Sequence, residues 1–346
     1  LALAVFGIGL LLGLDTLVSQ AFGARRLDEC HRWLHHGVAL ALVLAPIMML
    51  GAWIGIRTLR VWGIDPAVLR LLSPYLMVLI WSTLPLLMAA VLVVAIIAHD
   101  AWRGTGLFHV APVIELARLW RVVRLGFPAA MQMVLEVGVF ASATAFAGKL
   151  EPVSLAAHQI TLNMAGFTFM VPFGLASAGA VRVGQAVGRR DAAGAARAGW
   201  TALALGVAFM VTAAAAFLLI PRVLVGLFTV DHTVVSIGVS LFFIAAIFQM
   251  FDGVQGVLTG TLRGLGDTHT PMLWNLAGHW CFGLPFGYAL CFWWGWGVRG
   301  LWVGLSAGLM IVGVVLFVVW SRRVKTLARD LDSVTAVQIR SLQPEV

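Results

Sequence analysis

The sequence predicts an all-α polytopic membrane protein, a bundle of transmembrane helices with almost no soluble body. Hydrophobic residues make up 61% of the 346 residues and charged residues only 11%. An average soluble domain carries about 25% charged residues. Apolar stretches long enough to cross a bilayer also recur along the chain. A lipid-exposed surface explains this excess, because lipid-facing side chains must be apolar as well as the core-facing ones.

The apolar stretches predict nine spans. The first is expected to be incomplete, since the chain begins inside it, at Leu1, without a Met. Their boundaries follow from hydropathy and length alone. The nine spans are expected at 1–20, 33–57, 68–98, 125–148, 153–181, 195–220, 232–260, 271–293 and 298–321.

The loop charges predict the orientation of these spans. Of the 23 Lys and Arg residues, 17 fall in loops and tails on one side and 6 on the other. Loops rich in Lys and Arg stay in the cytoplasm. We therefore expect a multi-pass protein of the inner (plasma) membrane, with its C-terminus in the cytoplasm. The net charge of +8 then reflects topology rather than a nucleic-acid partner.

The segment before the fourth span, 112–124, has a different pattern. Glu115, Arg118, Arg121 and Arg124 recur at every third residue, with apolar residues between them. This pattern is typical of a short amphipathic helix on the cytoplasmic interface. An extension of the next span is the alternative interpretation.

An internal repeat links two spans. Residues 18–25 (VSQAFGAR) and 183–190 (VGQAVGRR) are identical at five of eight positions, 165 residues apart. A second similarity, between 64–68 and 230–234, has an offset of 166. An even number of spans separates the copies, so both face the same way. This predicts a parallel repeat with a pseudo-two-fold axis along the membrane normal, one of the two repeat plans of secondary transporters.

Polar residues at helical spacing mark the candidate site. Glu136 and Asp252 lie inside apolar stretches, where a charged residue costs about 2.5–3.5 kcal/mol. Amides and a histidine accompany them on four helices, and Asp15 lies inside the first span. These polar companions are Gln132, Gln159, Asn163, Gln255, Asn275 and His279.

Pointed inward, these groups would line one wet cavity. The alternative for each neutral residue is an interhelical hydrogen bond that only holds the bundle together, and for Asp15 it is a cap or loop contact. His158, close to a loop, is expected at the membrane interface. Glu136 and Asp252 could exchange a proton, or hold a monovalent cation together with amide oxygens. The residues leave both options open.

Enzyme function is not expected, since no phosphate loop, HExxH or GxSxG pattern occurs and the nine His are dispersed. Cys30, Cys281 and Cys291 lack metal-ligand or redox spacing. We therefore expect no cofactor, and no metal beyond a possible Na⁺ at Glu136 and Asp252.

Several long motifs resemble the multidrug and toxic compound extrusion (MATE) family. They occur in the family's order and cover nearly the whole chain. The motifs are LDTLVSQAFGA (14–24), LGFPAAMQMVLEVGVF (125–140), AAHQITLNMAGFTFMVPFGLASAGAVRVGQAVG (156–188), FDGVQGVLTGTLRGLGDT (251–268) and GLPFGYAL (283–290).

The resemblance implies a secondary antiporter that expels cationic or amphipathic drugs in exchange for H⁺ or Na⁺. It implies two six-helix lobes around a central cleft, and a protein that works as a monomer. By position, Glu136 and Asp252 match the acids of the family's C-lobe cation site. Sodium-coupled members often have Tyr four residues before the second acid, whereas this chain has Phe248.

The chain also departs from the family's length. Its motifs match helices two, three, part of four, the end of six, and seven to twelve. We therefore expect a shortened N-lobe of about three spans at 1–111, the amphipathic connection at 112–124, a C-lobe of six spans at 125–321 and a cytoplasmic tail at 322–346. A lipid-linked oligosaccharide flippase of the same superfamily, and a non-transporting remnant or membrane-assembly partner, are the alternative functions.

Overall fold

The computed structural model describes residues 2–58, 76 and 114–340, and none of these residues forms a β-strand. Seven of the described helices are long and apolar enough to cross a membrane. The expected span at 68–98 lies outside the described residues. The seven are α1 (Ala2–Gly23), α2 (Leu27–Thr58), α5 (Leu116–Ala147), α6 (Pro152–Gly188), α7 (Ala192–Leu219), α9 (His232–Gly264) and α12 (Gly297–Arg340).

The span expected at 271–293 is helical but not uniformly α-helical. It consists of α10 (His269–Asn275), the π-helix η2 (Leu276–Gly283), α11 (Leu284–Tyr288) and the π-helix η3 (Ala289–Trp293). A short helix, α8 (Pro221–Gly226), follows α7. π-Helical segments are rare and occur frequently at functional sites.

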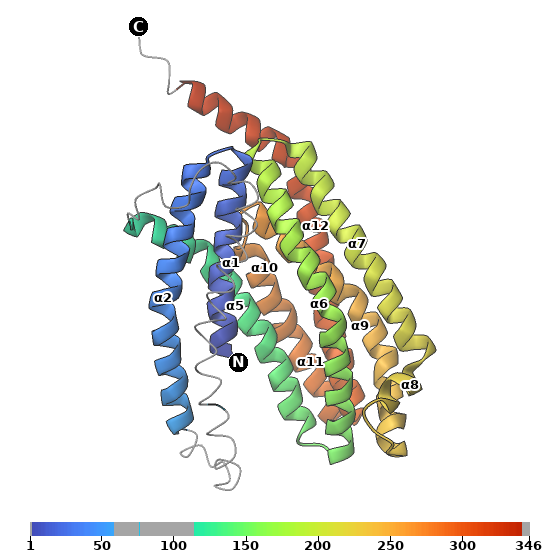
Figure 1. Cartoon of the computed structure of the whole chain (residues 1–346). Coiled ribbons are helices and arrows are strands. Elements are labelled where there is room, and N and C mark those ends of the chain that lie inside the picture. The colour runs from blue at the N-terminus through green and yellow to red at the C-terminus, as the bar shows by residue number, and fades with distance from the viewer. Residues whose placement is uncertain (1, 59–75, 77–113, 341–346) are drawn as a thin grey trace. The chain divides into compact units, whose positions relative to one another are not determined.

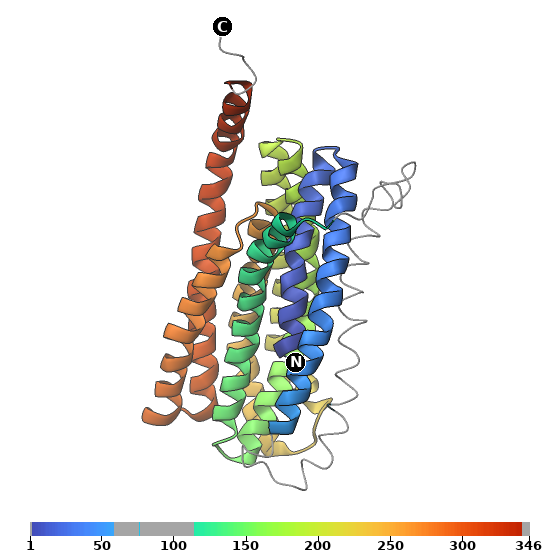
Figure 2. The same ribbon diagram turned by 90° about the vertical axis from the view of Figure 1, so that its left-hand side faces the viewer.

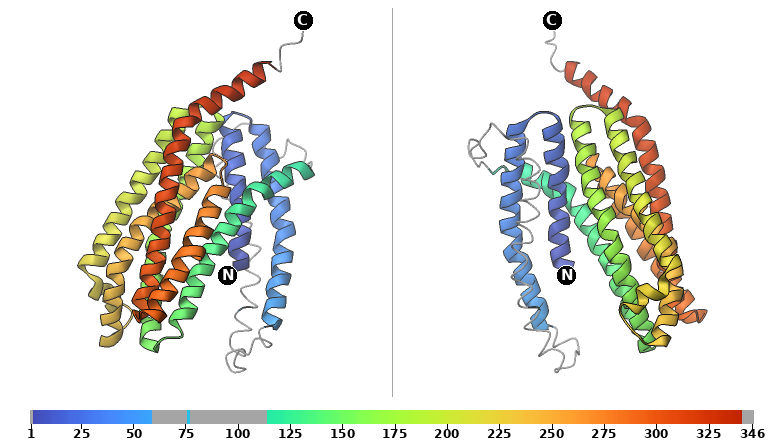
Figure 3. Two further views of the ribbon diagram at one scale, coloured as in Figure 1. Left: turned by 180° about the vertical axis from the view of Figure 1, so that it is seen from behind. Right: turned by 45° about the vertical axis from the view of Figure 1, so that its right-hand side comes forward.

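The chain divides into two compact units, Leu1–Val134 and Leu135–Val346, and the division falls inside α5. Residues 116–124 of the amphipathic segment form the first turns of α5, which runs without a break into the span. Figure 3 shows these first turns at an angle to the part of α5 that follows them.

In the first unit, α1 packs against α2 and against the beginning of α5. Leu10, Leu14, Trp33 and Val122 belong to its buried core. Gly126 of α5 meets the backbone of Leu10 so closely that a Cβ there would collide with the Leu10 carbonyl. Helices approach this closely in membranes only through small residues.

The second unit is centred on α9, which contacts α6, α7 and α12. Figure 1 shows α6, α7 and α9 side by side, and Figure 2 shows α12 beside the run from α10 to η3. Gly260 and Gly264 of α9 abut the backbone carbonyls of Ala176 and Ala180 of α6. The four-residue spacing on both helices is the small-xxx-small pattern of close membrane helix pairs.

The predicted repeat has the same backbone geometry in both copies. α1 ends at Gly23 and α6 at Gly188, the same offset of 165 residues. Each is followed by an arginine with positive φ, 59° at Arg25 and 58° at Arg190. The closing hydrogen bonds correspond one to one, including Arg26 N–H to the Ala21 carbonyl (3.0 Å) and Asp191 N–H to the Ala186 carbonyl (2.9 Å). This is the Schellman arrangement, and it supports an ancestral duplication.

Candidate functional site

Aromatic rings set the register between α5 and α9 in the second unit. The centroids of Phe140 and Phe248 lie 6.0 Å apart in an edge-to-face arrangement. One turn before Phe140 is Glu136, and one turn after Phe248 is Asp252. The two helices are antiparallel, so these steps lead in the same direction along the bundle. The register therefore brings the two predicted acids to the same level.

The candidate site consists of an acid pair, Glu136 and Asp252, and the side-chain amide of Gln255. The side chain of Gln255 hydrogen-bonds to the Glu136 carboxyl, and the charges of Glu136 and Asp252 interact. Asp252 is 5% exposed and Gln255 1%. Within the described part of the chain, the Gln255 Oε1 atom has no hydrogen-bond partner.

This arrangement can bind a proton or a small cation. A carboxylate accepts hydrogen bonds only, so the Gln255 amide N–H₂ is the donor to Glu136 and its oxygen is left over. Two ionised carboxylates in an apolar surrounding repel each other, and a proton or monovalent cation between them removes that repulsion. Among the described residues, no group of three His, Cys, Asp or Glu side chains could hold a metal ion.

Phe248 closes one end of the acid pair. Its ring is 1% exposed and packs 5.6 Å from the Trp302 ring of α12 as well as against Phe140. The layer next to the acids therefore presents ring carbons. A tyrosine hydroxyl, an extra oxygen for a cation, has no counterpart at this position.

His158 lies in a hydrogen-bonded chain beyond this aromatic layer. Trp302 Nε1–H donates to His158 Nδ1 at 3.1 Å, and His158 Nε2 lies 2.9 Å from Thr144 Oγ1. Because Nδ1 accepts, the neutral imidazole carries its proton on Nε2, which donates to the threonine. His158 is fully buried inside the protein, and its depth in the membrane stays a prediction. The chain ties α5, α6 and α12 together.

Gln249, which the sequence reasoning missed, links α9 to α6. Its Nε2–H₂ donates to Thr168 Oγ1, and its Oε1 has no partner among the described residues. Gln249 lies three residues before Asp252, the spacing that places two side chains on one helix face. That spacing is the signal that could have identified it.

Asn275 and His279 are buried on the helical run that contains η2. Both are at most 1% exposed, and their side-chain nitrogen and oxygen atoms have no partner in the described part of the protein. Between them, Gly278 packs against Gly308 and Val312 of α12. Asn275 and His279 thus face the interior of the second unit, although no contact given for the described residues joins them to the acid pair.

The other predicted residues are more scattered. Gln159 is half-buried and Asn163 is exposed, both on α6. Gln132 is buried one turn before Glu136, and Asp15 is half-buried in α1 of the first unit. The described contacts therefore bring together Glu136, Asp252 and Gln255.

The chain is similar to multidrug resistance proteins in sequence. The MatE family model matches residues 1–101 and 128–289. A probable multidrug resistance protein NorM of Mesorhizobium japonicum is 32% identical over 387 aligned positions, covering 92% of this chain and 83% of the relative. A probable NorM of Brucella suis is 42% identical over 213 positions, 60% of this chain and 45% of that protein. The longer alignment exceeds the 346 residues of this chain, so the relative contains residues without a counterpart here.

Solved structures show the same fold. The eukaryotic MATE transporter AtDTX14 superposes with a TM-score of 0.77 at 20% identity, covering 95% of this chain and 87% of that one. A MATE structure in the bent conformation gives a TM-score of 0.83 at 15% identity, with 96% and 86% coverage. Family model, relatives and fold agree, and the chain belongs to the MATE family, whose members are transporters rather than enzymes.

Proposed function

We propose that this chain exports cationic or amphipathic drugs in exchange for H⁺ or Na⁺, with Glu136 and Asp252 as the coupling site. The observation that carries the proposal is the acid pair, with Asp252 buried and Glu136 half-buried, beside a buried amide oxygen that has no partner among the described residues. The names of the relatives, which are multidrug resistance proteins, support the substrate class.

The free energy released by one inward-moving ion is sufficient to drive export of a substrate. A monovalent cation that moves inward is driven by about 2.3 kcal/mol per 100 mV. Since about 1.4 kcal/mol corresponds to a factor of ten, one charge supports roughly forty-fold accumulation of a neutral substrate.

The coupling belongs to the C-terminal lobe in this proposal. Residues 1–111 would form the shortened N-lobe and residues 125–321 the C-lobe, in a monomer of the inner membrane with a cytoplasmic tail. Gln132, Gln159, Asn163, Asn275 and His279 are the further polar positions that we assign to ion or substrate contact.

Export by the purified chain in proteoliposomes tests the proposal. Ethidium or norfloxacin movement would be followed under an imposed H⁺ gradient and, separately, an imposed Na⁺ gradient. We expect one gradient to accelerate export and Glu136→Gln or Asp252→Asn to reduce that acceleration about tenfold or more, because the variants remove a charge on which the ion acts.

Glu151→Gln is the matched control, because Glu151 is an exposed acid at the start of α6. It should leave gradient-driven export unchanged. Export that persists in both acid variants would show that the coupling site is elsewhere. A wild-type chain that folds but exports nothing under either gradient would contradict the proposed function.

A further inference from the structure

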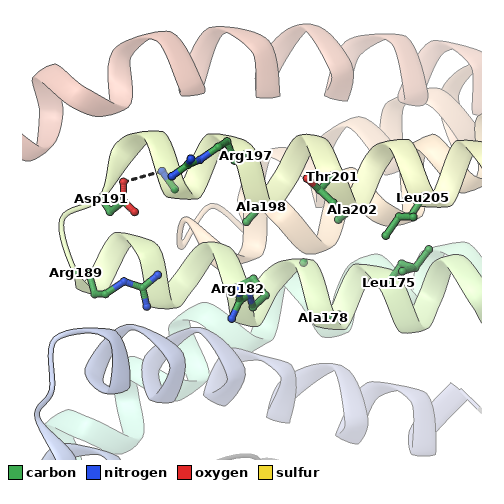
Figure 4. Close-up of a pocket in the computed structure, with 12 residues that line it drawn as sticks. Leu175, Ala178, Arg182, Arg189, Asp191, Arg197, Ala198, Thr201, Ala202 and Leu205 are labelled. Carbon is green, nitrogen blue, oxygen red and sulfur yellow. Dashed lines mark hydrogen bonds between the residues drawn. The ribbon is translucent and has the colours of Figure 1, made fainter.

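A basic groove lies between α6 and α7, at the ends joined by their connecting turn. Its volume is about 440 Å³. Three arginines line one end, Arg182 and Arg189 from α6 and Arg197 from α7, and Leu175 and Leu205 lie at the other end (Figure 4). The groove is thus cationic where the helices end and apolar farther along them.

No acidic side chain in the described part of the chain forms an ion pair with the arginines of this groove. All three are exposed, and none forms an ion pair among the described residues. The nearby carboxylate, Asp191, caps α7 by accepting the Gly194 backbone N–H at 2.7 Å. The groove therefore carries an excess of positive charge that an external anion would balance.

The groove has the length and polarity profile of a lipid. Leu175 and Leu205 lie about 20 Å from the helix ends, and the three arginines within about 10 Å, at a rise of 1.5 Å per residue. Arginines at that depth reach the headgroup level of a bilayer. The small side chains of Ala178, Ala198 and Ala202 leave room beside them for an acyl chain.

The internal repeat shows that the turn itself does not need Arg182 and Arg189. In the first copy, which ends in the same Schellman arrangement, Leu17 and Ala24 occupy the positions of Arg182 and Arg189. The apolar positions are kept, since Leu10 and Leu40 correspond to Leu175 and Leu205. Arg32 corresponds to Arg197, so the two copies share the third arginine and differ in charge at the positions of Arg182 and Arg189.

We propose that this groove binds one anionic phospholipid, such as phosphatidylglycerol. Its phosphate pairs with the guanidinium groups of Arg182, Arg189 and Arg197, and an acyl chain lies along Leu175, Ala202 and Leu205. Guanidinium groups bind phosphate through paired, charge-assisted hydrogen bonds, and basic pockets between transmembrane helices select anionic headgroups.

Native mass spectrometry of the purified chain tests this site. Phosphatidylglycerol and phosphatidylcholine with identical acyl chains would be added at equal concentrations. The number of molecules of each lipid that stay bound to the protein would then be measured. We expect a preference for phosphatidylglycerol that falls about tenfold in the double variant Arg182→Leu, Arg189→Ala, because the charge-assisted bonds are removed. These substitutions are the residues of the other repeat copy, so the scaffold should tolerate them.

Two further variants keep the test decisive if the double variant is unstable. Arg322→Leu with Lys325→Ala removes the same charge from α12 and should keep the preference. Thr201→Trp fills the exposed groove without changing charge and should reduce retention of both lipids.

Equal retention of the two lipids by the wild-type chain would overturn the proposal. So would loss of the preference in the α12 variant alone. Millimolar glycerol 3-phosphate should not displace the lipid, and displacement would show a soluble-phosphate site instead.

Discussion

At the scale of single residues, the N–H₂ group and the oxygen of the Gln255 amide differ in their hydrogen bonding. Its N–H₂ group binds the Glu136 carboxyl, whereas its oxygen has no partner in the described structure. An unpaired buried oxygen costs about 1–3 kcal/mol. A cation or a proton held at the acid pair can satisfy it, so the cost of the empty site favours occupation.

Thr144 gives a direct test of the hydrogen-bonded chain through His158. Thr144→Val keeps the shape of the side chain and removes the only acceptor of the His158 Nε2 proton that is shown. We expect a loss of about 1–3 kcal/mol, because a buried donor is left unsatisfied. Thermal unfolding in detergent measures it.

Thr212→Val is the control, since the Thr212 hydroxyl is exposed and donates only to the Phe209 carbonyl of its own helix. It should change the melting temperature little. Equal effects of both substitutions would show that the chain through His158 contributes nothing specific.

Asp231 makes one helix end sensitive to pH. Its carboxylate accepts the backbone N–H groups of Val234 and Thr233 at the start of α9, and these bonds lower its pKa from the ordinary 3.8. A lowered folded-state pKa means stabilisation that is present above pH 3.8 and is lost as the pH falls through the lowered value.

The Asp231→Ala variant should therefore melt at a lower temperature than the wild type at neutral pH. The difference should shrink as the pH is lowered below 3.8. Glu151→Ala is matched, because Glu151 is the N-cap residue of α6 but its side chain makes no cap bond. A difference that stays constant with pH would contradict the role of the ionised cap.

At the scale of elements, the contact between α6 and α9 depends on Gly260. A Cβ at this position meets the backbone of Ala176, and backbone cannot move aside as a flexible side chain can. We expect Gly260→Ala to cost about 1–3 kcal/mol, the usual cost of overpacking. Thermal unfolding and yield of monodisperse protein measure this cost.

Gly174→Ala is the control on α6, because a Cβ added there meets no atom within 4 Å. It should be neutral or slightly stabilising, since alanine has the higher helix propensity. A Gly260 variant as stable as the Gly174 variant would show that the two helices do not approach closely.

Hydropathy predicts the uniform helices well and the irregular one poorly. The stretch expected at 232–260 is α9, His232–Gly264, and the stretch expected at 153–181 is α6, Pro152–Gly188. The π-helical turns η2 and η3 could not be predicted. The mean hydropathy of a sequence window indicates whether a segment lies in lipid, but it carries no information on the backbone hydrogen-bond pattern.

The candidate site can be predicted to the extent that its chemistry is unusual. An acid in an apolar stretch is conspicuous, which makes Glu136 and Asp252 candidates, and helical spacing adds Gln255. The chain of Thr144, His158 and Trp302 joins three helices that are distant in sequence, and no single-helix periodicity connects them.

At the scale of the whole molecule, the loop charges predict on which side of the membrane the tail lies. Because the basic loops and the tail share one side, a reporter after residue 346 should be cytoplasmic. Green fluorescent protein fused there should fluoresce, and alkaline phosphatase fused there should be inactive.

Fusions after Lys149, in the turn between α5 and α6, should give the opposite result. A phosphatase signal from the C-terminal fusion would mean that every described span has the opposite orientation to the one predicted. Equal signals at both positions would contradict the odd number of crossings between them.

The two arginines with positive φ give the molecule a pair of equivalent internal probes. Arg25 and Arg190 end corresponding helices with the same backbone geometry, one in each unit. An identical label or substitution at each position therefore starts from the same local conformation. Any difference between the two responses then reports how the surroundings of the two helix ends differ, independently of the chemistry of the label.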